Sequence, residues 1–404
     1  MKILTINCGS SSLKYTFFEM PEKKELCAGI FEQLGTPAPT FTHKLPNEEG
    51  KMTKVLDKKP LDPGYDHGGA IRILLDTLTD KGGLGVLNDL SEIDAVGHRV
   101  LHGGEKFSGA VRVNEAVKQA IRECIPLGPL HNPANLMGIE AFEKTLPDVP
   151  QVAVFDTGFH ATMPDYAYMY ALPYEYYKKY GIRRYGFHGT SHEYVSGRCL
   201  DILGRTEGTK IVTCHLGNGS SITAVKDGKC FDTTMGLTPL EGIIMGTRCG
   251  SIDPAVVLFL MKNEHLSIDE MDALMNKKSG MLGLTEDTSD NRTIEKRAAE
   301  GEPRSVLIEN MICHQMAKYI GGFAAAMGGL DAVVFTGGIG ENNPQYRTRV
   351  AEKLAFLGVT IDQTANHVRG KEIEISTPDS KVKMFIIPTN EELAIAGKTA
   401  DLLK

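Results

Sequence analysis

The sequence predicts an α/β protein of two domains. Three observations carry this prediction: strand-like apolar runs alternate with helical patterns, the length is that of two domains, and one hairpin motif occurs twice. The chain has 404 residues, which is room for two domains of roughly 100 to 200 residues each. Strands that alternate with helices are typical of α/β architecture, whose ligands bind beyond the carboxyl ends of the strands.

Six short β-branched or apolar runs are predicted as strands, because each ends at Gly, Asp or Asn residues. They are Ile3–Ile6, Ile93–Val96, Val152–Phe155, Ile211–Thr213, Ala332–Phe335 and Val382–Ile387. Helical periodicity predicts helices over Ala70–Thr79, Glu115–Glu123, Ser267–Met275 and Ser305–Met327. A last helix is predicted to begin with Thr389 as N-cap and Glu392 completing a capping box, which places Glu391 in the first turn.

A weak internal repeat favours two domains of the same plan. Residues 3–18 and residues 211–225 each read as an apolar strand, a Gly/Ser turn and a second strand-like run. Two such hairpins about half a chain apart indicate a duplicated domain with one phosphate-facing turn in each half. Gly/Ser hairpins are common, so coincidence stays open on this feature alone.

Charge and hydropathy argue against several classes of partner. The chain carries 44 Lys and Arg residues against 51 Asp and Glu residues, a formal net charge of −7, with no basic run. Such a chain gives no electrostatic footprint for nucleic acid or for an anionic membrane surface. The apolar stretch Ile320–Leu330 falls short of the roughly 20 residues that span a bilayer.

The expected compartment is the cytoplasm. The N-terminal segment turns polar at once, unlike a signal peptide. The eight cysteines form no Cys-x-x-Cys pair. We therefore expect reduced thiols in a cytoplasmic enzyme.

Three glycine-rich turns after predicted strands are candidate phosphate cradles. Glycine accounts for 43 residues, more than the average of about 7%, and it allows backbone N–H groups to approach a ligand closely. The turn at 7–14 (NCGSSSLK) adds three hydroxyls and the ammonium group of Lys14, while the turns at 217–221 (GNGSS) and 336–342 (TGGIGEN) offer N–H groups. Each turn alone is weak evidence, because glycine turns usually only reverse the chain. Three of them favour nucleotide binding.

Two arginines lie where an anion would need them. Arg99 follows a predicted strand in GHRVLHGG (97–104), and Arg248 lies in the loop MGTRCG (245–250). The planar guanidinium group suits an anion with several oxygens. A solvated surface arginine is the usual alternative, but the neighbouring His and Gly residues are poor choices for a plain surface.

Carboxylates and histidines near these turns extend the candidate site. Asp156 ends a predicted strand and Glu391 begins a helix. Each could simply be a helix cap or a turn residue. Together they could hold Mg²⁺, because this ion is bound by one or two carboxylates together with water and phosphate oxygens. Three histidines in turns are either core residues or site residues: His131, His188 and His215. The pair His188 and His192 has i, i+4 spacing but lacks the Glu of a zinc protease, and no GxSxG elbow occurs.

Nine motifs, in order from one end of the chain to the other, carry a family resemblance. They are NCGSSSLK (7–14), GHRVLHGGEKF (97–107), PLHNPANL (129–136), VFDTGFH (154–160), RRYGFHGTSH (183–192), HLGNGSS (215–221), MGTRCG (245–250), FTGGIGEN (335–342) and PTNEELAIA (388–396). Together they closely resemble the acetate kinase family, within the superfamily of actin, the heat-shock ATPases and the sugar kinases.

The resemblance implies a fold, a reaction and partners. The fold would be two duplicated actin-like (ribonuclease H-like) domains flanking a nucleotide-binding cleft. Residues 1–157 with 391–404 would form the acetate-side domain, and residues 158–390 the nucleotide-side domain. The reaction would be reversible, Mg²⁺-dependent phosphoryl transfer from ATP to acetate, giving acetyl phosphate and ADP, with Mn²⁺ as an alternative metal. The protein would be a homodimer, with a place in acetyl-CoA biosynthesis.

The resemblance also implies roles for individual residues. Arg99 and Arg248 would clamp acetate and the transferring group, with Asp156 in the catalytic set and His188 donating a hydrogen bond. Asn7 and Glu391 would serve the metal, and His131 would support the site. The acetate methyl pocket would be lined by Leu101, Leu130, Phe187 and Pro239. ATP would contact Ser10, Ser12, Lys14, His215, Gly217, Asn218, Gly219, Asp290, Asn291, Arg292, Gly337, Gly338, Ile339, Gly340 and Asn342.

Departures from the family pattern raise three questions. Cys249 and Ser251 stand where the family mostly has Ser and Asp, which questions how the arginine loop is anchored. Leu101 replaces the usual Val, so the methyl pocket is expected to be tighter and less suited to propionate. Asn291 replaces a residue that is often apolar or aromatic, which leaves the purine contact open.

Alternatives to an acetate kinase follow from the same residues. The first is a propionate kinase, or another short-chain acyl kinase, with the same chemistry. The second is an actin-like assembly or regulatory protein in which ATP switches a partner interface. The third is the same fold using pyrophosphate, although the turn at 336–342 and Arg292 favour ATP.

Overall fold

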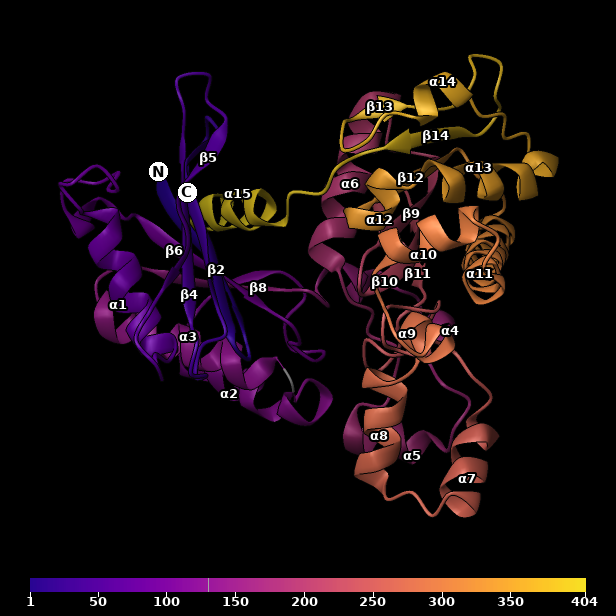
Figure 1. The fold of residues 1–404 in the computed structure, drawn as a ribbon, viewed down its shortest axis with the longest axis horizontal. Helices are drawn as coiled ribbons and strands as arrows, with labels where there is room; N and C mark the ends of the chain where they lie inside the picture. Colours follow the sequence, from indigo (N-terminus) through magenta and orange to yellow (C-terminus); the bar gives the residue numbers. More distant parts are fainter. Residues whose placement is uncertain (130) are drawn as a thin grey trace. The chain divides into compact units, whose positions relative to one another are not determined.

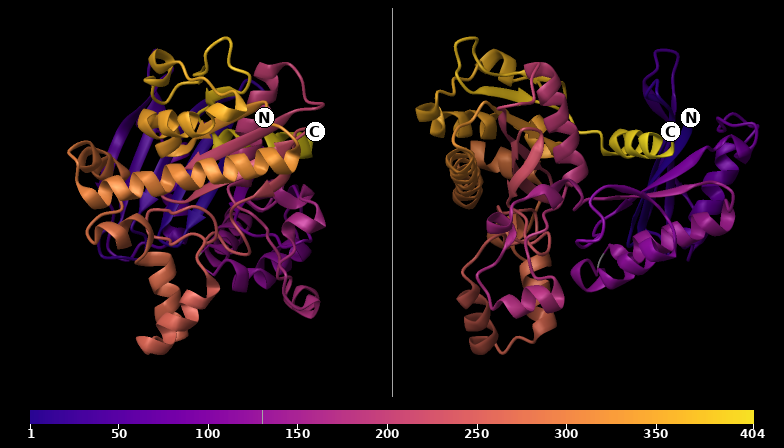
Figure 2. Two further views of the ribbon diagram at one scale, coloured as in Figure 1. Left: turned by 90° about the vertical axis from the view of Figure 1, so that its right-hand side faces the viewer. Right: turned by 180° about the vertical axis from the view of Figure 1, so that it is seen from behind.

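The chain divides into two compact units. The structure, a computed structural model, describes residues 1–129 and 131–404. Unit 1 comprises Met1–Gly158 and Asn390–Lys404, and unit 2 comprises Phe159–Thr389. Each unit is built on one mixed β-sheet with helices against its faces (Figures 1 and 2).

Unit 1 contains an eight-stranded sheet in the order β5-β4-β3-β2-β1-β6-β8-β7. Neighbouring strands from β1 to β5 are antiparallel, whereas β6 runs parallel to both β1 and β8. The strands are β1 (Lys2–Gly9), β2 (Ser12–Glu19), β3 (Lys24–Glu32), β4 (Thr40–Pro46), β5 (Met52–Pro60), β6 (Ala95–Val100), β7 (Ala110–Arg112) and β8 (Gln151–Phe155).

Helices cover both faces of this sheet, because the side chains of β1 alternate between them. Leu4 packs in a core with α1 (His67–Leu78) and α3 (Asn132–Thr145). Helix α2 (Glu115–Glu123) lies beside α3. Ile3 points to the other face and packs against Ala396 and Ala400 of α15 (Glu391–Leu403). This arrangement brings the start of α15 to strands β1 and β6.

Unit 2 contains a six-stranded sheet in the order β11-β10-β9-β12-β14-β13. The strands are β9 (Lys210–Leu216), β10 (Ser220–Lys226), β11 (Lys229–Thr233), β12 (Ala332–Thr336), β13 (Ile373–Glu374) and β14 (Lys383–Ile386). The run β11-β10-β9-β12-β14 has the same connectivity and strand directions as β3-β2-β1-β6-β8 of unit 1. The duplicated α/β fold predicted from the repeated hairpin is confirmed.

The sheet of unit 2 is also covered on both faces. The long helix α11 (Pro303–Met327) packs on one face with α9 (Gly280–Thr285), α10 (Asn291–Ala299) and α13 (Pro344–Lys353), and α6 (Gly189–Leu203) packs on the other. Shorter helices are α4 (Asp165–Tyr168), α5 (Tyr174–Tyr180), α12 (Gly337–Asn342) and α14 (Gln363–Asn366).

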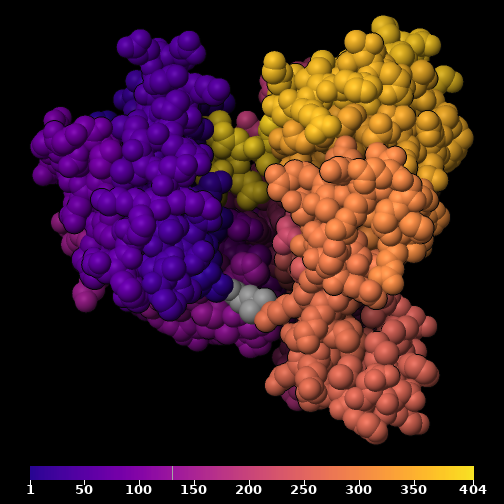
Figure 3. Space-filling view, in the orientation of Figure 1, coloured from indigo at the N-terminus to yellow at the C-terminus, as the bar shows by residue number. Residues whose placement is uncertain are grey.

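Two further helices of unit 2, α7 (Pro254–Asn263) and α8 (Ile268–Lys277), protrude from the rest of this unit as a small lobe (Figure 3). Leu258 and Phe259 of α7 are exposed there, at 71% and 65% of their full surface. Within the described part of the chain, no helix has both the length and the apolar character needed to cross a bilayer.

Two predicted boundaries are wrong. The N-cap of α15 is Asn390, whose side chain accepts from the Leu393 N–H, and not Thr389. The backbone N–H of Thr389 instead donates to Glu341, which fixes this residue one position before the N-cap. Ile93 lies before β6, because it ends a short 3₁₀ turn whose cap is Asp89. Glu391 does lie in the first turn of α15, as predicted.

Candidate active site

Unit 1 gathers three of the predicted site residues around the guanidinium group of Arg99. Arg99 extends from β6 and donates to both carboxylate oxygens of Asp156, at 3.1 Å from Nε to Oδ1 and 2.6 Å from Nη2 to Oδ2. Its Nη1 lies 3.4 Å from Oδ1 of Asn7, and its Nε lies 3.9 Å from Oε2 of Glu391. The parallel pairing of β1, β6 and β8 explains this convergence, since their carboxyl ends meet at one edge of the sheet.

This cluster is charged and largely removed from water. Asp156 is fully buried, and the Arg99 side chain is 20% exposed. Burial disfavours the charged form of Arg99, but the nearby carboxylates of Asp156 and Glu391 outweigh it and raise the pKa of the guanidinium group. Burial, together with the charges of Asp156 and Glu392, raises the pKa of Glu391 to about 6 against the attraction of Arg99.

The raised pKa of Glu391 predicts a stability that depends on pH. The folded protein binds the proton of the Glu391 carboxyl group more tightly than the unfolded chain does. The contribution of this proton to the free energy of unfolding is therefore complete below pH 4.5, and it is lost as the pH rises through about 6. Glu391→Gln should therefore be more stable than the parent at pH 7, by about 2 kcal/mol without metal, and equally stable below pH 4.5. Urea unfolding at both pH values checks this. Equal stabilities at pH 7 would contradict it.

The oxygen atoms of this cluster fit a divalent cation. The donor set consists of two carboxylates, Asp156 and Glu391, and the amide oxygen of Asn7, all beside Arg99. Hard oxygen donors of this kind, completed by water and phosphate oxygens, suit Mg²⁺. Among the described residues, no group of three or more His, Cys, Asp or Glu side chains could hold a metal, so this donor set depends on the amide of Asn7 as its third protein ligand.

The β1–β2 hairpin of unit 1 carries the first predicted phosphate turn. Ser10 is exposed, Ser12 is partly exposed, and the Lys14 ammonium forms an ion pair with Glu392 of α15. The carbonyl of Gly9 accepts a hydrogen bond from the ring of His67, which fixes the base of the turn. The hydroxyls of the turn are thus presented to solvent beside a lysine that α15 holds in place.

The remaining predicted site residues of unit 1 are Leu101, Leu130 and His131. Leu101 is buried, and its backbone N–H donates to Oδ1 of Asn135 at 3.0 Å. His131 is the N-cap residue of α3. Leu130, also predicted for the methyl pocket, lies outside the described residues.

Unit 2 places His188 at a strained point of the backbone. This residue adopts a left-handed conformation (φ 57°) as the N-cap of α6, and Gly186 just before it also has positive φ (76°). A side chain at Gly186 would fall 2.7 Å from the ring of His160, so glycine is required there. Strain of this kind in a non-glycine residue is typical of functional positions. The ring of His188 stacks on His215 of β9, with 4.2 Å between centroids.

Arg248 lies beside His188 at the turn between β9 and β10. A Cβ atom built on Gly219 would lie 3.3 Å from Nη1 of Arg248 and 3.4 Å from Nε2 of His188, so both groups border the same point. Nη1 of Arg248 donates to the carbonyl of Pro239 at 2.9 Å. Among the described residues no carboxylate pairs with Arg248, and burial lowers its pKa. A half-buried cation without a carboxylate partner is suited to an anionic ligand.

The loop that carries Arg248 is anchored despite its unusual sequence. Oγ of Ser251 accepts from the backbone N–H of Gly242 at 3.1 Å, and the Ser251 N–H donates to the Gly242 carbonyl at 2.8 Å. The Cys249 N–H donates to the carbonyl of Met275. These bonds answer the question raised by Cys249 and Ser251, because the hydroxyl and the backbone N–H of Ser251 both bind Gly242 while the Cys249 N–H binds Met275.

A cavity of about 630 Å³ lies within unit 2, next to this turn. It is bordered by the glycine-rich turns after β9 and β12, the start of α10 and the start of α13. Its lining residues are Gly217, Asn218, Gly246, Met281, Ser289, Asp290, Asn291, Arg292, Glu295, Gly338, Ile339, Asn342, Asn343 and Arg369. A cavity of this size, rich in backbone N–H groups at one end, is suited to a nucleotide.

Most of the ATP-binding residues predicted in unit 2 border this cavity. The β12–α12 turn closes tightly there, since Gly337 has a φ of 76° and a Cβ atom would lie 2.7 Å from the carbonyl of Leu216. Gly219, Gly337 and Gly340 belong to the same turns but do not line the cavity, and His215 lies behind the β9 turn. Asn342 holds the α12 turn by donating to the Gly338 carbonyl.

The start of α10 is shaped by Asp290 and Asn291. Asp290 caps the helix and also forms a two-point ion pair with the exposed side chain of Arg292. Oδ1 of Asn291 accepts a hydrogen bond from the buried hydroxyl of Tyr346 at 2.8 Å. Because the oxygen of Asn291 already accepts this bond, its side chain offers the cavity N–H donors. This chain therefore has a hydrogen-bond donor at a position expected to be apolar or aromatic.

Comparison with known proteins identifies the family. The sequence model described as the acetokinase family matches residues 2–397. The chain belongs to the acetokinase family. Curated acetate kinases from Thermotoga maritima and Carboxydothermus hydrogenoformans are 53% and 52% identical to this acetokinase over 408 and 404 residues, covering 100% of this chain and 99% of each relative.

Solved structures show the same fold. The crystal structure of Porphyromonas gingivalis acetate kinase superposes with a TM-score of 0.92 at 47% identity, covering 100% of both chains. A propionate kinase from Francisella tularensis superposes with a TM-score of 0.90 at 40% identity, covering 98% of both chains. These likenesses confirm the actin-like two-domain fold that the resemblance implied.

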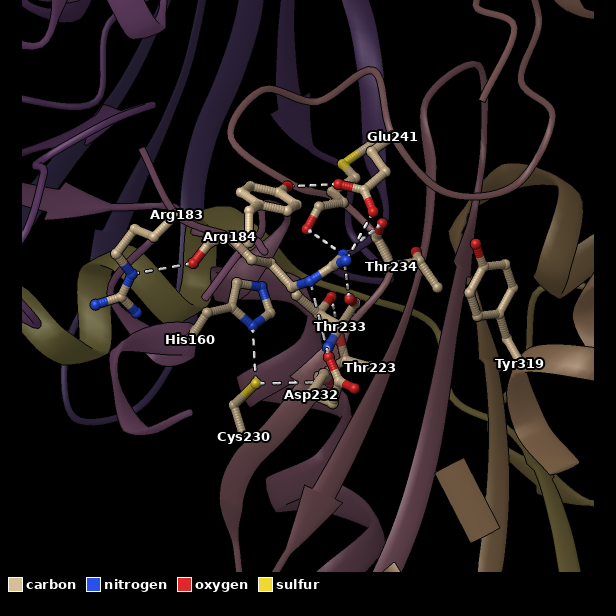
Figure 4. A network of polar contacts seen from close by, with 12 residues as sticks. His160, Arg183, Arg184, Thr223, Cys230, Asp232, Thr233, Thr234, Glu241 and Tyr319 are labelled. Atoms are coloured by element: carbon tan, nitrogen blue, oxygen red, sulfur yellow. Dashed lines mark hydrogen bonds and ion pairs between the residues drawn. The ribbon is translucent and has the colours of Figure 1, made fainter. Parts of the chain in front are cut away.

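Sequence reasoning missed a polar network that supports the arginine loop of this acetokinase (Figure 4). Nη1 of Arg184 donates to the carbonyls of Thr233, Thr234 and Met235, and its Nη2 donates to Glu241 at 2.7 Å. Tyr170 donates to the other oxygen of Glu241 at 2.5 Å. The second arginine of the RRYGFHG run was the available signal, but its partners are distant in sequence.

A second missed contact holds the backbone just before His188. Nε2 of His160 donates to the carbonyl of Phe187 at 2.9 Å, and Nδ1 lies 3.1 Å from the sulfur of Cys230 (Figure 4). Because the sulfhydryl can donate to Nδ1, the ring can donate from Nε2 to the carbonyl. Phe187 itself is fully buried. The placement of His188 therefore depends on residues of β11 and of the turn at Phe159–Thr162.

Proposed function

We propose that this protein catalyses the reversible transfer of the γ-phosphoryl group of ATP to acetate, giving acetyl phosphate and ADP. The observation that carries the proposal is the position of Arg248 and His188 beside Gly219, in the turn whose residues Gly217 and Asn218 line a nucleotide-sized cavity, in a member of the acetokinase family. Incubation with ATP, a divalent metal and acetate, followed by hydroxylamine trapping of acetyl phosphate, tests it. An actin-like nucleotide switch without an acyl substrate would give no hydroxamate.

Direct in-line transfer is the mechanism that these residues support. Acetate is already an anion near neutral pH, so attack on the γ-phosphorus needs no general base. The obstacle is repulsion between the carboxylate and the phosphate oxygens. Arg99, Arg248 and His188 would offset this repulsion by placing positive charge and a hydrogen-bond donor at the equatorial oxygens. A kinetically competent phosphoenzyme isolated after mixing with ATP would contradict direct transfer.

A divalent cation is the proposed cofactor, with Mg²⁺ first and Mn²⁺ as the alternative. Asn7, Asp156 and Glu391 are the residues that would hold it, directly or through water. When bound, it would neutralise charge on the phosphate oxygens. Arg99 would keep Asp156 oriented through its two-point hydrogen bond, and the ionised form of Glu391 is favoured above about pH 6.

The two units are proposed to divide the substrates. Unit 1 would hold acetate through Arg99, and the turn residues Ser10, Ser12 and Lys14 would contact phosphate. Unit 2 would hold the nucleotide, with the base between α10 and α13 and the phosphates along the turns at 217–221 and 337–342. The lining of the cavity by the Asp290–Arg292 segment supports ATP rather than pyrophosphate as the donor, because pyrophosphate has no base to fill that end.

Acetate is proposed as the preferred acyl substrate, and a propionate kinase is the second candidate because a relative of that name has the same fold. Leu101, Leu130, Phe187 and Pro239 are the proposed methyl pocket. Leu101→Ala should raise kcat/KM for propionate relative to acetate by about 10-fold. Propionate has one methylene more than acetate, and discrimination of one methylene in an apolar pocket amounts to about 10 to 200-fold. Steady-state kinetics with acetate, propionate and butyrate checks this. An unchanged ratio would remove Leu101 from the pocket.

A homodimer is the proposed assembly. The exposed apolar side chains of α7, Val256, Leu258 and Phe259, offer a surface that a second copy of the chain would cover. Light scattering on the purified protein would give twice the chain mass of 44.1 kDa if the proposal is correct.

A cytoplasmic location, a role in acetyl-CoA biosynthesis and the lack of a nucleic-acid or membrane partner stay predictions.

A further inference from the structure

A continuous chain of hydrogen bonds runs behind His188. Nδ1 of His188 lies 2.9 Å from Oγ of Ser221, and the same hydroxyl lies 2.7 Å from Nε2 of His192. Nδ1 of His192 lies 2.7 Å from the hydroxyl of Thr213. Ser221, His192 and Thr213 are fully buried and come from β10, α6 and β9.

The hydroxyl of Ser221 couples the two histidine rings. A serine hydroxyl has one proton to donate, so it can donate to one of the two ring nitrogens and must accept a hydrogen bond from the other. His192 is held neutral, because burial, aided by His160 and His215, lowers its pKa well below the usual value. A neutral ring has one N–H donor and one acceptor nitrogen. Where the proton of His188 lies is therefore tied to the orientation of Ser221.

Two arrangements of protons satisfy this chain. In the first, Thr213 donates to His192, His192 donates to Ser221, and Ser221 donates to Nδ1 of His188. In the second, every bond is reversed, and the hydroxyl of Thr213 turns to the Thr223 carbonyl at the longer distance of 3.4 Å. The first arrangement leaves the proton of neutral His188 on Nε2. The second leaves Nε2 of neutral His188 as a bare acceptor.

Nε2 is the nitrogen of His188 that faces the reaction. It borders the same point beside Gly219 as the guanidinium group of Arg248. A phosphoryl oxygen at that point is an acceptor, so it needs an N–H on Nε2 and is repelled by a lone pair. Only the first arrangement supplies that N–H without an extra proton on the ring.

We propose that Ser221 is a positioning residue which, through His192 and Thr213, keeps the proton of His188 on Nε2 and so makes the neutral ring a donor to the transferring phosphoryl group. This inference rests on the proposed function. Ser221 touches neither substrate in it and acts through His188. The relay resembles in principle the way a carboxylate fixes the tautomer of a catalytic histidine, where the wrong tautomer lowers kcat by about 10⁴.

The relay has a distinctive dependence on pH. A protonated His188 donates from Nε2 whatever Ser221 does, whereas neutral His188 depends on the relay. The titratable or charged groups that face His188 are His192 on α6, His215 on β9 and Arg248 on its loop. An ordinary histidine is neutral above about pH 6.5, so at pH 8 the neutral ring has to carry the reaction.

The test compares the full-length enzyme with Ser221→Ala over pH 6 to 9. We expect Ser221→Ala to lower kcat by about 10 to 100-fold at pH 8, the scale seen when the hydrogen-bond partner that orients a metal-ligating histidine is removed, while KM for ATP changes little. The ratio of parent to variant kcat should shrink toward low pH, where His188 becomes protonated. Thr213→Val, which removes the far end of the relay, should lower kcat by a smaller factor with the same pH trend.

Thr223→Val is the matched control. Thr223 is a fully buried hydroxyl on the same strand, paired with Thr233, and its side chain does not belong to the relay. It should keep parental kcat at every pH. A Ser221→Ala enzyme with parental kcat at pH 8, or with a loss equal at all pH values, would overturn the proposal.

A spectroscopic readout tests the tautomer itself. With ¹⁵N-labelled histidine, the ring of His188, assigned by comparison with His188→Gln, should show a protonated Nε2 and a bare Nδ1 at pH 8 in the complex with ADP and a divalent metal. A proton on Nδ1 would overturn the proposal. A parent enzyme that makes no acetyl phosphate would instead refute the proposed function, so the two failures are distinguishable.

Discussion

Replacing Arg248 by alanine is expected to lower kcat by about 10²- to 10³-fold, the effect of removing one preorganised electrostatic donor from an active site. The guanidinium group has no carboxylate partner within the described part of the chain, and it is held by the Pro239 carbonyl and the Met245 sulfur. Its positive charge is therefore available to a phosphoryl oxygen, in surroundings where burial weakens screening by water.

The stability of this variant should separate catalysis from folding. Because burial already disfavours the charge of Arg248 and no carboxylate of the described residues pairs with it, Arg248→Ala should unfold at a urea concentration close to that of the parent. Arg304→Ala, which removes an exposed arginine paired with Glu286, is the control and should change neither kcat nor stability. Near-normal turnover of Arg248→Ala would remove this residue from the mechanism.

Replacing Arg99 by alanine should lower kcat by a similar or larger factor, and it should also destabilise unit 1. The carboxylate of Asp156 is fully buried and makes a two-point hydrogen bond to Arg99. Removing one partner of such a pair leaves an uncompensated buried charge, which costs about 3 to 5 kcal/mol. The free energy of unfolding from urea titrations at pH 7 would show this loss, and kinetics would show the loss of kcat.

A double variant distinguishes the two effects of Arg99. In Arg99→Ala/Asp156→Asn the buried side chain is neutral, so most of the lost stability should return. Activity should not return, because the proposed anion clamp and the carboxylate proposed to hold the metal are both missing. If Arg99→Ala alone keeps the parental stability, the ion pair does not have the energetic role that its geometry indicates. Restored activity in the double variant would contradict the assignment of both residues.

The local elements of this protein were predictable because their signals are local. Residues 3–18 and 211–225 showed a strand, a Gly/Ser turn and a second strand, and the structure contains the two hairpins in sheets of the same connectivity. The helix at Glu115–Glu123 followed from its periodicity. The cap of α15 was misassigned, because Thr389 and Asn390 are both good caps and a contact with Glu341, 48 residues away in sequence, decides between them.

Motifs also identified the candidate site residues, since glycine turns, arginines and carboxylates after strands are readable one segment at a time. These local signals were enough to establish the α/β class, the duplication, the family and the residue types that could contact phosphate. The tertiary structure decided how they are used: it pairs Arg99 with Asp156, leaves Arg248 without a carboxylate partner among the described residues, and links His188 to Thr213 through Ser221 and His192. The physical reason is that a pKa, a tautomer or an ion pair depends on atoms within a few ångströms, and sheet pairing brings those atoms together from segments that are far apart in the chain.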